Sequence, residues 1–237
     1  ELTDEELAVQ FQYQDVVAAF ERTTYSSIYV IDYQSKTFDY VSRNPLFLCG
    51  LSPEEVRELG YAFYFNYVLE EDLLLLERIN TVGFDFYDKI PLDEKRLYTI
   101  SYDFHLKNLD GKIMLVNQKL TPMYLNRRGQ IWKALCTVSL SSRKKSGNVR
   151  ITKSGSNDVF HYNMSESRWR LVTQIKLSDR ETEIIRYSIR GFTINEIANE
   201  MYVTAETVKF HRSKLFIKLG VSNISEAIFF VTNNKMI

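Results

Sequence analysis

Apolar and polar residues alternate with a period of two through the middle of the chain. Between residues 98 and 107, apolar side chains occupy every second position, which is the pattern of a strand with one buried and one exposed face. Glycine-containing turns at 110–111 and 127–129 then separate this segment from two further candidate strands, 112–125 and 131–140. In the last of these, one face carries Trp132, Ala134, Cys136, Val138 and Leu140. We therefore expect three consecutive antiparallel strands.

Helical and hairpin patterns precede these strands. Residues 4–22 place apolar side chains three and four positions apart, as an amphipathic helix does, and residues 26–32 and 37–42 form a candidate hairpin. Ser52 is followed by a proline and, three positions on, by a glutamate, which is the signature of a helix start with a capping box. Short helices placed before three antiparallel strands predict an α+β fold for residues 1–142.

The amino-acid composition changes beyond the predicted strands. Residues 143–170 are poor in apolar side chains and rich in Ser, Lys, Asn and Gly, so we expect a linker there, with at most short strands near 149–151 and 159–162. Charge changes at the same place: residues 1–142 carry 14 basic and 21 acidic side chains, whereas residues 143–175 carry 7 and 2. A polyanion would repel the first part and attract the second.

Beyond the expected linker the pattern is wholly helical. Three segments begin with a capping residue that precedes a glutamate by three positions: Ser178, Thr193 and Asn223. A fourth segment begins with the capping residue Thr204, without such a glutamate. Gly191 and Gly220 stand where two of the helices should end. These signals predict an all-α domain over 171–237, with helices 179–190, 194–201, 205–219 and 224–234. A short helix, a three-residue turn and a longer helix form a helix-turn-helix.

The third of these helices has two contrasting faces. Counting 100° per residue, Val208, Leu215 and Leu219 fall in one narrow arc and should face the domain core. The opposite side carries Lys209, Phe210, Ser213, Lys214 and Ile217. Ordinary solvated surface explains this mixture of lysine and apolar side chains poorly. In a major groove, Lys209 could bond guanine or phosphate, and Phe210 could contact a thymine methyl group.

Phosphate contacts are expected at the start and the borders of the same helix. Thr204 and Thr207 stand at the positive end of the helix dipole, where phosphate oxygens bind. Arg212 lies at the border of the outer face and should reach a phosphate. We expect His211, also at the border, to be a structural hydrogen-bonding residue.

Four consecutive stretches resemble the LuxR/FixJ (GerE)-type helix-turn-helix: 177–181, 191–198, 203–212 and 218–221. The resemblance implies a sequence-specific regulator of transcription that binds a double-stranded DNA operator, with RNA polymerase as a further partner if it is an activator. In this family the last helix makes the dimer contact, so the resemblance also implies a homodimer on a two-part operator. The apolar stripe of that helix here consists of Ile224, Ala227, Ile228 and Val231.

The order of elements over residues 23–142 resembles that of a PAS domain: a hairpin, short helices, and three long antiparallel strands. The resemblance implies a sensor domain that receives a signal or mediates dimerisation, with a GAF domain or another small sensor fold as the main alternative. A phosphate-accepting receiver domain is disfavoured, because it would repeat βα units rather than end in antiparallel strands. We thus expect a PAS-like α+β domain followed by an all-α domain of four helices.

The sequence identifies no cofactor or metal, although a small molecule could bind the PAS-like domain. His105 is the one candidate for a haem ligand there, but the period of two places it on the polar face of its strand, as a surface histidine. Cys49 and Cys136 lack the Asn-Cys-Arg context of a light-sensing flavin site. The aromatic segments 61–67 and 84–87 either form core or line a small-molecule pocket.

Several other classes of protein fit the sequence less well. The first residues are acidic, unlike a signal peptide, and no apolar run approaches the roughly 20 residues needed to span a bilayer, so we expect a cytoplasmic protein with no membrane partner. A sigma factor would need a helical polymerase-binding domain in place of the predicted strands. A signalling scaffold without DNA binding stays open as an alternative. We expect no catalytic residues, because no phosphate-binding glycine loop or nucleophile motif is present.

Overall fold

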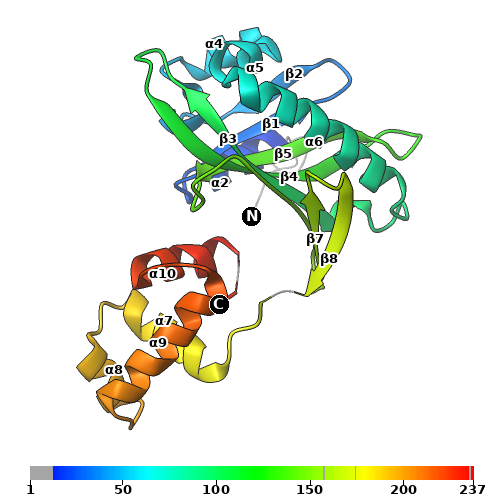
Figure 1. The fold of residues 1–237 in the computed structure, drawn as a ribbon. Coiled ribbons are helices and arrows are strands. Elements are labelled where there is room, and N and C mark those ends of the chain that lie inside the picture. The colour runs from blue at the N-terminus through cyan, green and yellow to red at the C-terminus, as the bar shows by residue number, and fades with distance from the viewer. Residues whose placement is uncertain (1–12, 157, 174, 235) are drawn as a thin grey trace, which may run out of the picture. The chain divides into compact units, whose positions relative to one another are not determined.

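Two compact units make up the chain. The computed structural model describes residues 13–156, 158–173, 175–234 and 236–237, and the division between the units falls after Val172. The first unit contains the sheet and the second is helical (Figure 1).

The first unit is built on an eight-stranded sheet with the strand order β2-β1-β5-β4-β3-β6-β7-β8. Its strands are β1 (Ser27–Asp32), β2 (Thr37–Val41), β3 (Tyr98–Lys107), β4 (Ile113–Leu125), β5 (Ile131–Leu140), β6 (Gly147–Lys153), β7 (Asp158–Asn163) and β8 (Arg168–Thr173). Its described helices are α2 (Tyr13–Glu21), α3 (Pro45–Leu48), α4 (Pro53–Leu59), α5 (Ala62–Tyr67) and α6 (Glu70–Asp88), with a 3-10 turn, η1 (Lys95–Leu97). The order β2-β1-β5-β4-β3, with helices inserted between β2 and β3, confirms the predicted PAS-like α+β fold.

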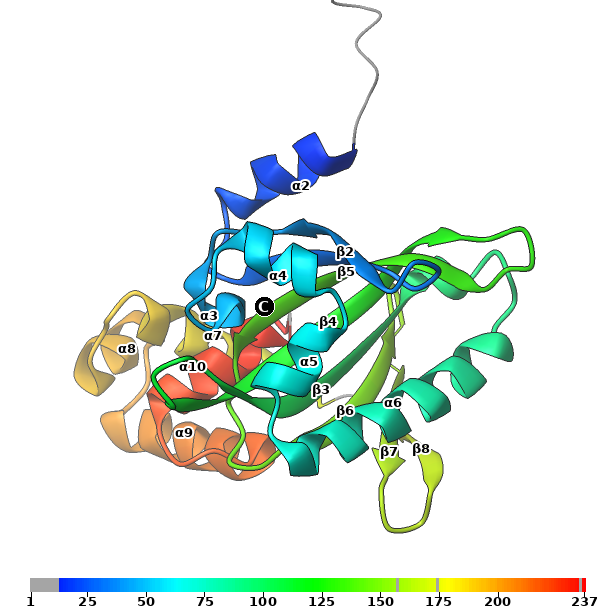
Figure 2. The same ribbon diagram turned by 90° about the horizontal axis from the view of Figure 1, so that it is seen from above.

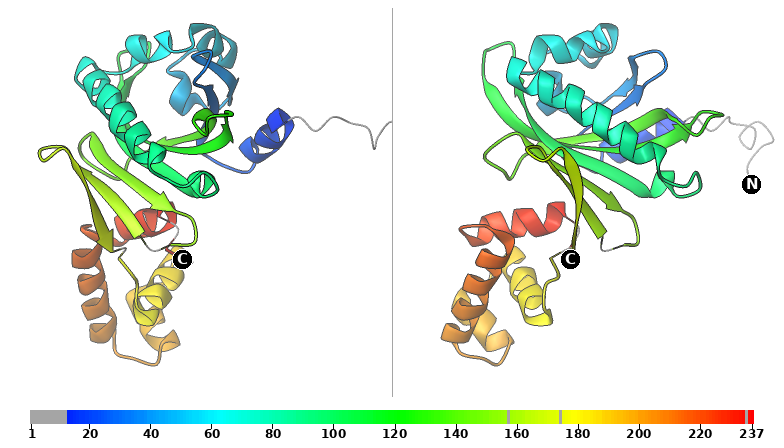
Figure 3. Two further views of the ribbon diagram at one scale, coloured as in Figure 1. Left: turned by 90° about the vertical axis from the view of Figure 1, so that its right-hand side faces the viewer. Right: turned by 45° about the vertical axis from the view of Figure 1, so that its right-hand side comes forward.

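Helices cover both faces of this sheet. Helices α3 to α6 lie on one face, where Phe47, Phe63 and Phe104 are fully buried in the main core (Figure 2). Helix α2 lies on the other face, where its Val17 packs in a cluster with Ile28 of β1 (Figure 3). Of the predicted helix 4–22, the part before Tyr13 lies outside the described residues.

The apolar face predicted for β3 is buried as expected, but Asp103, predicted on the polar face, is also buried, where its carboxylate accepts hydrogen bonds from Asn117 and Asn148. The prediction for β5 is also only partly correct. Ala134, Cys136 and Val138 are buried as expected, but Trp132 and Leu140 are 37% and 55% exposed. The pairing of β5 with β4 shifts register near the start of β5. Ile131 is therefore buried in place of Trp132. The Trp132 indole instead donates to the carboxylate of Asp32 at 3.1 Å.

The segment 143–170, predicted as a linker, continues the sheet. Strand β6 pairs with β3, and β7 pairs with β6. Helix α6 holds these added strands: the Phe86 ring lies 5.0 Å from that of Phe160 and 5.2 Å from that of Trp169, and Arg78 donates to the carbonyl of Met164 at 2.8 Å. The short strands expected near 149–151 and 159–162 are present within β6 and β7. The linker prediction is nevertheless wrong, because pairing with β3 and aromatic contacts with α6 order a segment whose own composition is polar.

The second unit contains the four predicted helices: α7 (Asp179–Ile189), α8 (Ile194–Glu200), α9 (Ala205–Leu219) and α10 (Ile224–Asn233). Ser178 and Thr193 form the predicted capping boxes, and Gly191 and Gly220 adopt positive φ angles of 85° and 67° where α7 and α9 end. Among the described residues, no single helix is long and apolar enough to cross a membrane.

Candidate nucleic-acid interface

A four-residue turn, 201–204, one residue longer than predicted because α8 ends at Glu200, sets α9 against α8 (Figure 3). Tyr202 adopts the left-handed conformation (φ 54°), and the Val203 N–H donates to the carbonyl of Ala198 at 2.9 Å. Thr204 then caps α9 by accepting a hydrogen bond from the Thr207 N–H at 3.2 Å. The turn and the cap together define the direction in which α9 leaves the rest of the unit.

The inner face of α9 forms the core of the second unit, as predicted. Val208 is fully buried beside Ile184 and Ile197 of α7 and α8. Leu215 and Leu219 are buried in a second cluster that includes residues of α7 and α10. These two clusters fix the rotation of α9 about its axis at both ends. The opposite face of the helix is therefore directed away from this core.

Most of the predicted site residues lie on that opposite face. Lys209, Phe210, Ser213 and Lys214 are exposed, and Phe210 is 56% exposed. The adjacent Ile217 is 83% exposed, so the face combines positive charge with apolar groups that the core does not use. We call this set of five residues the outer face of α9.

Local contacts order the side chains of the outer face. The Lys214 ammonium lies 4.4 Å from the centre of the Phe210 ring, and His211 meets the same ring edge-on at 5.7 Å. Lys209 pairs with Glu206 at 3.5 Å. Glu206 was not predicted as a site residue, although the same 100° count places it at the centre of this face; its carboxylate adds an acceptor beside the lysines.

Two of the three predicted phosphate partners, Thr207 and Arg212, are less exposed than the outer face. Thr204 is exposed and Thr207 is half-buried, and their hydroxyl oxygens lie 2.9 Å apart at the start of α9. Arg212 is half-buried, with its guanidinium 5.7 Å from the Phe216 ring, and burial lowers its pKa from the ordinary arginine value. The expected hydrogen-bonding role of His211 stays a prediction, because the contact described for it is the ring contact with Phe210.

An ion pair ties the end of α9 to the start of α7. Lys218 Nζ donates to Glu181 Oε2 at 2.7 Å, and Glu181 also accepts the backbone N–H of Ser178 at 2.7 Å. Burial opposes ionisation of Glu181, but the bonds from Lys218 and Ser178 outweigh it and lower the pKa of this carboxyl. The capping box of α7 therefore also positions α9.

The last helix keeps part of its apolar stripe accessible. Ala227 and Val231 are buried in the core, as expected, whereas Ile224 and Ile228 are half-buried. Phe229, beside them in sequence, is 36% exposed. The stripe is thus partly core and partly surface.

The candidate cofactor ligands of the first unit, His105, Cys49 and Cys136, are enclosed by the fold. His105 is not an open surface residue: its Nδ1 lies 2.7 Å from Asp72, whose buried carboxylate also accepts the His105 N–H at 2.6 Å. Burial raises the pKa of Cys49 and of Cys136 to about 12, so both thiols stay protonated at neutral pH. Among the described residues, no group of three or more His, Cys, Asp or Glu side chains could hold a metal ion.

The aromatic segment 61–67 serves as both core and cavity wall. Phe63 is fully buried in the core, whereas Tyr61 and Tyr64 line a cavity of about 450 Å³ between α5, α6 and the sheet.

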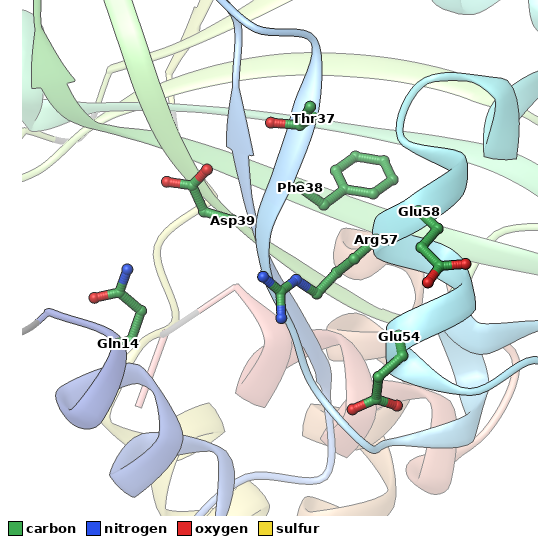
Figure 4. A pocket seen from close by; sticks show the side chains of 7 residues that line it. All are labelled: Gln14, Thr37, Phe38, Asp39, Glu54, Arg57 and Glu58. Atoms are coloured by element: carbon green, nitrogen blue, oxygen red, sulfur yellow. The ribbon is translucent and has the colours of Figure 1, made fainter.

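A wider hollow of about 670 Å³ lies between α2, β2 and α4 (Figure 4). Its walls are largely polar and charged: Gln14, Thr37, Phe38, Asp39, Glu54, Arg57 and Glu58. Asp39 is engaged by the Tyr13 hydroxyl and the Lys133 ammonium. The hollow therefore has the character of hydrated surface.

Comparison with known proteins gives matches to both units. The family model described as "Bacterial regulatory proteins, luxR family" matches residues 176–231. The CsgBAC operon transcriptional regulatory protein of Escherichia coli is 33% identical over 180 residues, which cover 67% of this chain and 77% of that protein. The Fimbriae Z protein of Salmonella typhimurium is 31% identical over 61 residues, 26% of this chain and 29% of that protein. The chain thus spans less than a third of the length of that relative.

Among solved structures, a dimer of Vibrio cholerae VqmA, described as a LuxR-type receptor, aligns with 96% of this chain and 89% of its own, at 15% identity and a TM-score of 0.38. A PAS domain from Colwellia psychrerythraea aligns with 55% of this chain and 98% of its own, at 15% identity and a TM-score of 0.40.

Proposed function

The chain belongs to the luxR family of bacterial regulatory proteins, and we propose that it is a cytoplasmic, sequence-specific DNA-binding regulator of transcription. The observation that carries the proposal is the outer face of α9, which presents lysines and unburied apolar side chains on a helix whose inner face is fixed in the core. A helix held in this way by a short turn is the element that enters a major groove.

Each side chain of the interface has a role in this proposal. Lys209, Phe210, Ser213 and Lys214 meet base edges and the thymine methyl group in the major groove. The start of α9 receives a phosphate between Thr204 and Thr207, where the free N–H groups and the helix dipole favour an anion. Arg212 completes the phosphate contacts from the border of the face.

We propose that two copies bind together to a two-part operator. Half-buried Ile224 and Ile228 of α10, with exposed Phe229, offer an apolar surface to a second copy. Two copies of α9 would then read half-sites about one helical turn apart. RNA polymerase is the further partner if the protein is an activator.

The first unit, up to Val172, is proposed to receive a signal or to help pair the two copies. Its α+β fold is unlike the helical polymerase-binding domain of a sigma factor, so we favour a regulator over a promoter-recognition subunit. A scaffold that has lost DNA binding is the remaining alternative, and the following experiment separates it.

The test is selection of DNA from a random pool by the full chain, followed by affinity measurement on the selected operator. Lys209→Ala with Arg212→Ala should weaken binding at least tenfold, since each lost contact contributes about 1–3 kcal/mol. The matched control is Lys112→Ala with Arg127→Ala, which removes the same charge from exposed turns of the first unit. Failure to enrich any sequence, or equal effects of the two pairs, would reject α9 as the DNA-reading helix.

A further inference from the structure

We propose that the cavity between α5, α6 and the sheet binds a small neutral molecule that offers a hydrogen-bond acceptor to Tyr102. This inference depends on the proposed function only for its regulatory meaning. Binding itself is measured without DNA, so either proposal can fail while the other stands.

The cavity has the dimensions and the layout of a receptor site. Its volume is about 450 Å³, within the roughly 300–1,000 Å³ usual for small-molecule pockets. Residues of α5 and α6 line one side of it, and these helices lie over the sheet (Figure 2). Its rim includes Phe65 and Leu74, which are 72% and 71% exposed, while its floor contains Tyr102 and Gln118, which are 5% and 2% exposed. An apolar entrance thus leads to buried polar groups.

The direction of the hydrogen bonds on the floor shows which group is available. Tyr29 donates its only proton to Gln118 Oε1 at 2.7 Å. The hydroxyl of Tyr64, 2.7 Å from that of Tyr29, must therefore be the donor of that pair. Gln118 Nε2 donates to the Tyr102 hydroxyl at 2.6 Å. Tyr102 accepts in this chain of bonds, and its own proton has no acceptor among the described residues.

The charge of the walls selects against an ionised ligand. Of the described residues that line the cavity, none is a lysine, arginine or histidine, and one is a carboxylate, Glu77, which is exposed. Burial raises the pKa of Tyr64 and of Tyr102 well above the usual tyrosine value, so both stay neutral donors. An anion would lose its hydration here without gaining a cation.

A second buried hydroxyl lies close to the same floor. A void of about 20 Å³ shares Tyr33, Asn80 and Tyr102 with the cavity and is also lined by Tyr87. The Tyr87 side chain is buried, and its hydroxyl has no hydrogen-bond partner among the described residues. An unpaired buried hydroxyl is unfavourable. In addition to the hydrogen bond with Tyr102, a polar group of the bound molecule, or one water held by it, would form a hydrogen bond with the Tyr87 hydroxyl.

Three naphthalene derivatives of nearly equal shape test the proposal by calorimetric titration of the full chain. 2-Acetylnaphthalene is neutral and carries an acceptor, 2-isopropenylnaphthalene is neutral and lacks one, and 2-naphthoate is an anion. We expect the ketone to bind about three- to tenfold more tightly than the alkene, as one net hydrogen bond provides, and the naphthoate to bind weakest.

Tyr102→Phe should remove the preference for the ketone and leave the affinity for the alkene unchanged. Tyr25→Phe is the matched control, since Tyr25 is fully exposed on the same unit. It should change neither the preference for the ketone nor the affinity for the alkene. Leu76→Trp, which fills the cavity from α6, should block both neutral probes. The proposal is overturned if neither neutral probe binds, if naphthoate binds as tightly as the ketone, or if Tyr102→Phe, with an unchanged melting curve, keeps the ketone preference.

Discussion

Replacing Lys218 by methionine should destabilise the second unit and leave the first unchanged. Lys218 Nζ lies 2.7 Å from Glu181 Oε2, with side chains that are 36% and 8% exposed. Methionine keeps the aliphatic stem but leaves the carboxylate with only the hydrogen bonds of Ser178. A hydrogen bond to a charged group contributes about 1.5–3 kcal/mol, and the partial exposure of Lys218 places the expected loss near the lower value, about 1.5 kcal/mol.

The loss should appear as a lower melting temperature of the helical unit. For a domain of this size, 1 kcal/mol corresponds to about 4–8 °C, so the expected shift is about 6–12 °C. Helical circular dichroism reports both units, because both contain helices, while the fluorescence of Trp132 and Trp169, the two tryptophans of the chain, reports the first unit alone. The shift should therefore appear in the part of the circular dichroism transition that has no counterpart in fluorescence. The fluorescence transition should therefore not move.

The effect should also depend on pH. Because the pKa of Glu181 is lowered in the folded protein, its ion pair contributes fully above the unfolded pKa, about 4.3. That contribution is lost as the pH falls through the lower, folded value. The difference between the native protein and Lys218→Met should thus be full at pH 7 and shrink below pH ~4.3.

The control is Lys214→Met, which removes an exposed lysine from the same helix. It should change the free energy of unfolding by less than about 0.5 kcal/mol. A native-like melting curve for Lys218→Met at pH 7, or a loss that is the same at pH 7 and at pH 3, would refute the assigned role of the ion pair.

Three further outcomes follow from the structure. Arg78→Met removes the bonds from α6 to the β7–β8 turn, so hydrogen exchange in that hairpin should quicken while β1 is unaffected; unchanged exchange would show that the bonds do not hold it. If Arg212 contacts a phosphate in each copy of a dimer, the logarithm of DNA affinity should fall with the logarithm of salt concentration, and Arg212→Met should reduce the steepness of that slope by about 2; a flat dependence would contradict the contacts. Because burial raises the pKa of Cys49 and of Cys136 to about 12, iodoacetamide at pH 8 should label neither thiol until urea unfolds the chain, and rapid labelling of the folded protein would contradict their burial.

The second unit could be predicted almost completely from the sequence because its signals are local. Ser178, Thr193 and Thr204 each cap a helix through a bond to the backbone three residues later, so the cap is visible within four consecutive residues. The inner face of α9 followed from helical periodicity alone. Glu206 was not predicted because cations and apolar groups, rather than a carboxylate, are expected to face DNA, although helical periodicity also places it on the outer face.

The strands after β5 were predicted only as short segments of a linker, near 149–151 and 159–162, because what orders them is distant in sequence. Phe160 and Trp169 are isolated aromatics in a polar segment, and only the fold brings them against Phe86 of α6. The same holds for His105, which period-two counting places on a polar face but which Asp72, at the start of α6, partly encloses. The cavity floor likewise depends on Tyr29 and Gln118 meeting across the sheet.

The most direct test of the account compares the DNA sequences selected by the native chain and by Lys209→Ala. If α9 reads bases, the native chain should select two half-sites about one helical turn apart, and the variant should lose preference at one base pair in each half-site while keeping the rest. Arg212→Ala should instead weaken binding to all sequences and keep the same motif. A motif that Lys209→Ala and Phe210→Ala both leave unchanged would contradict recognition of DNA by the outer face of α9.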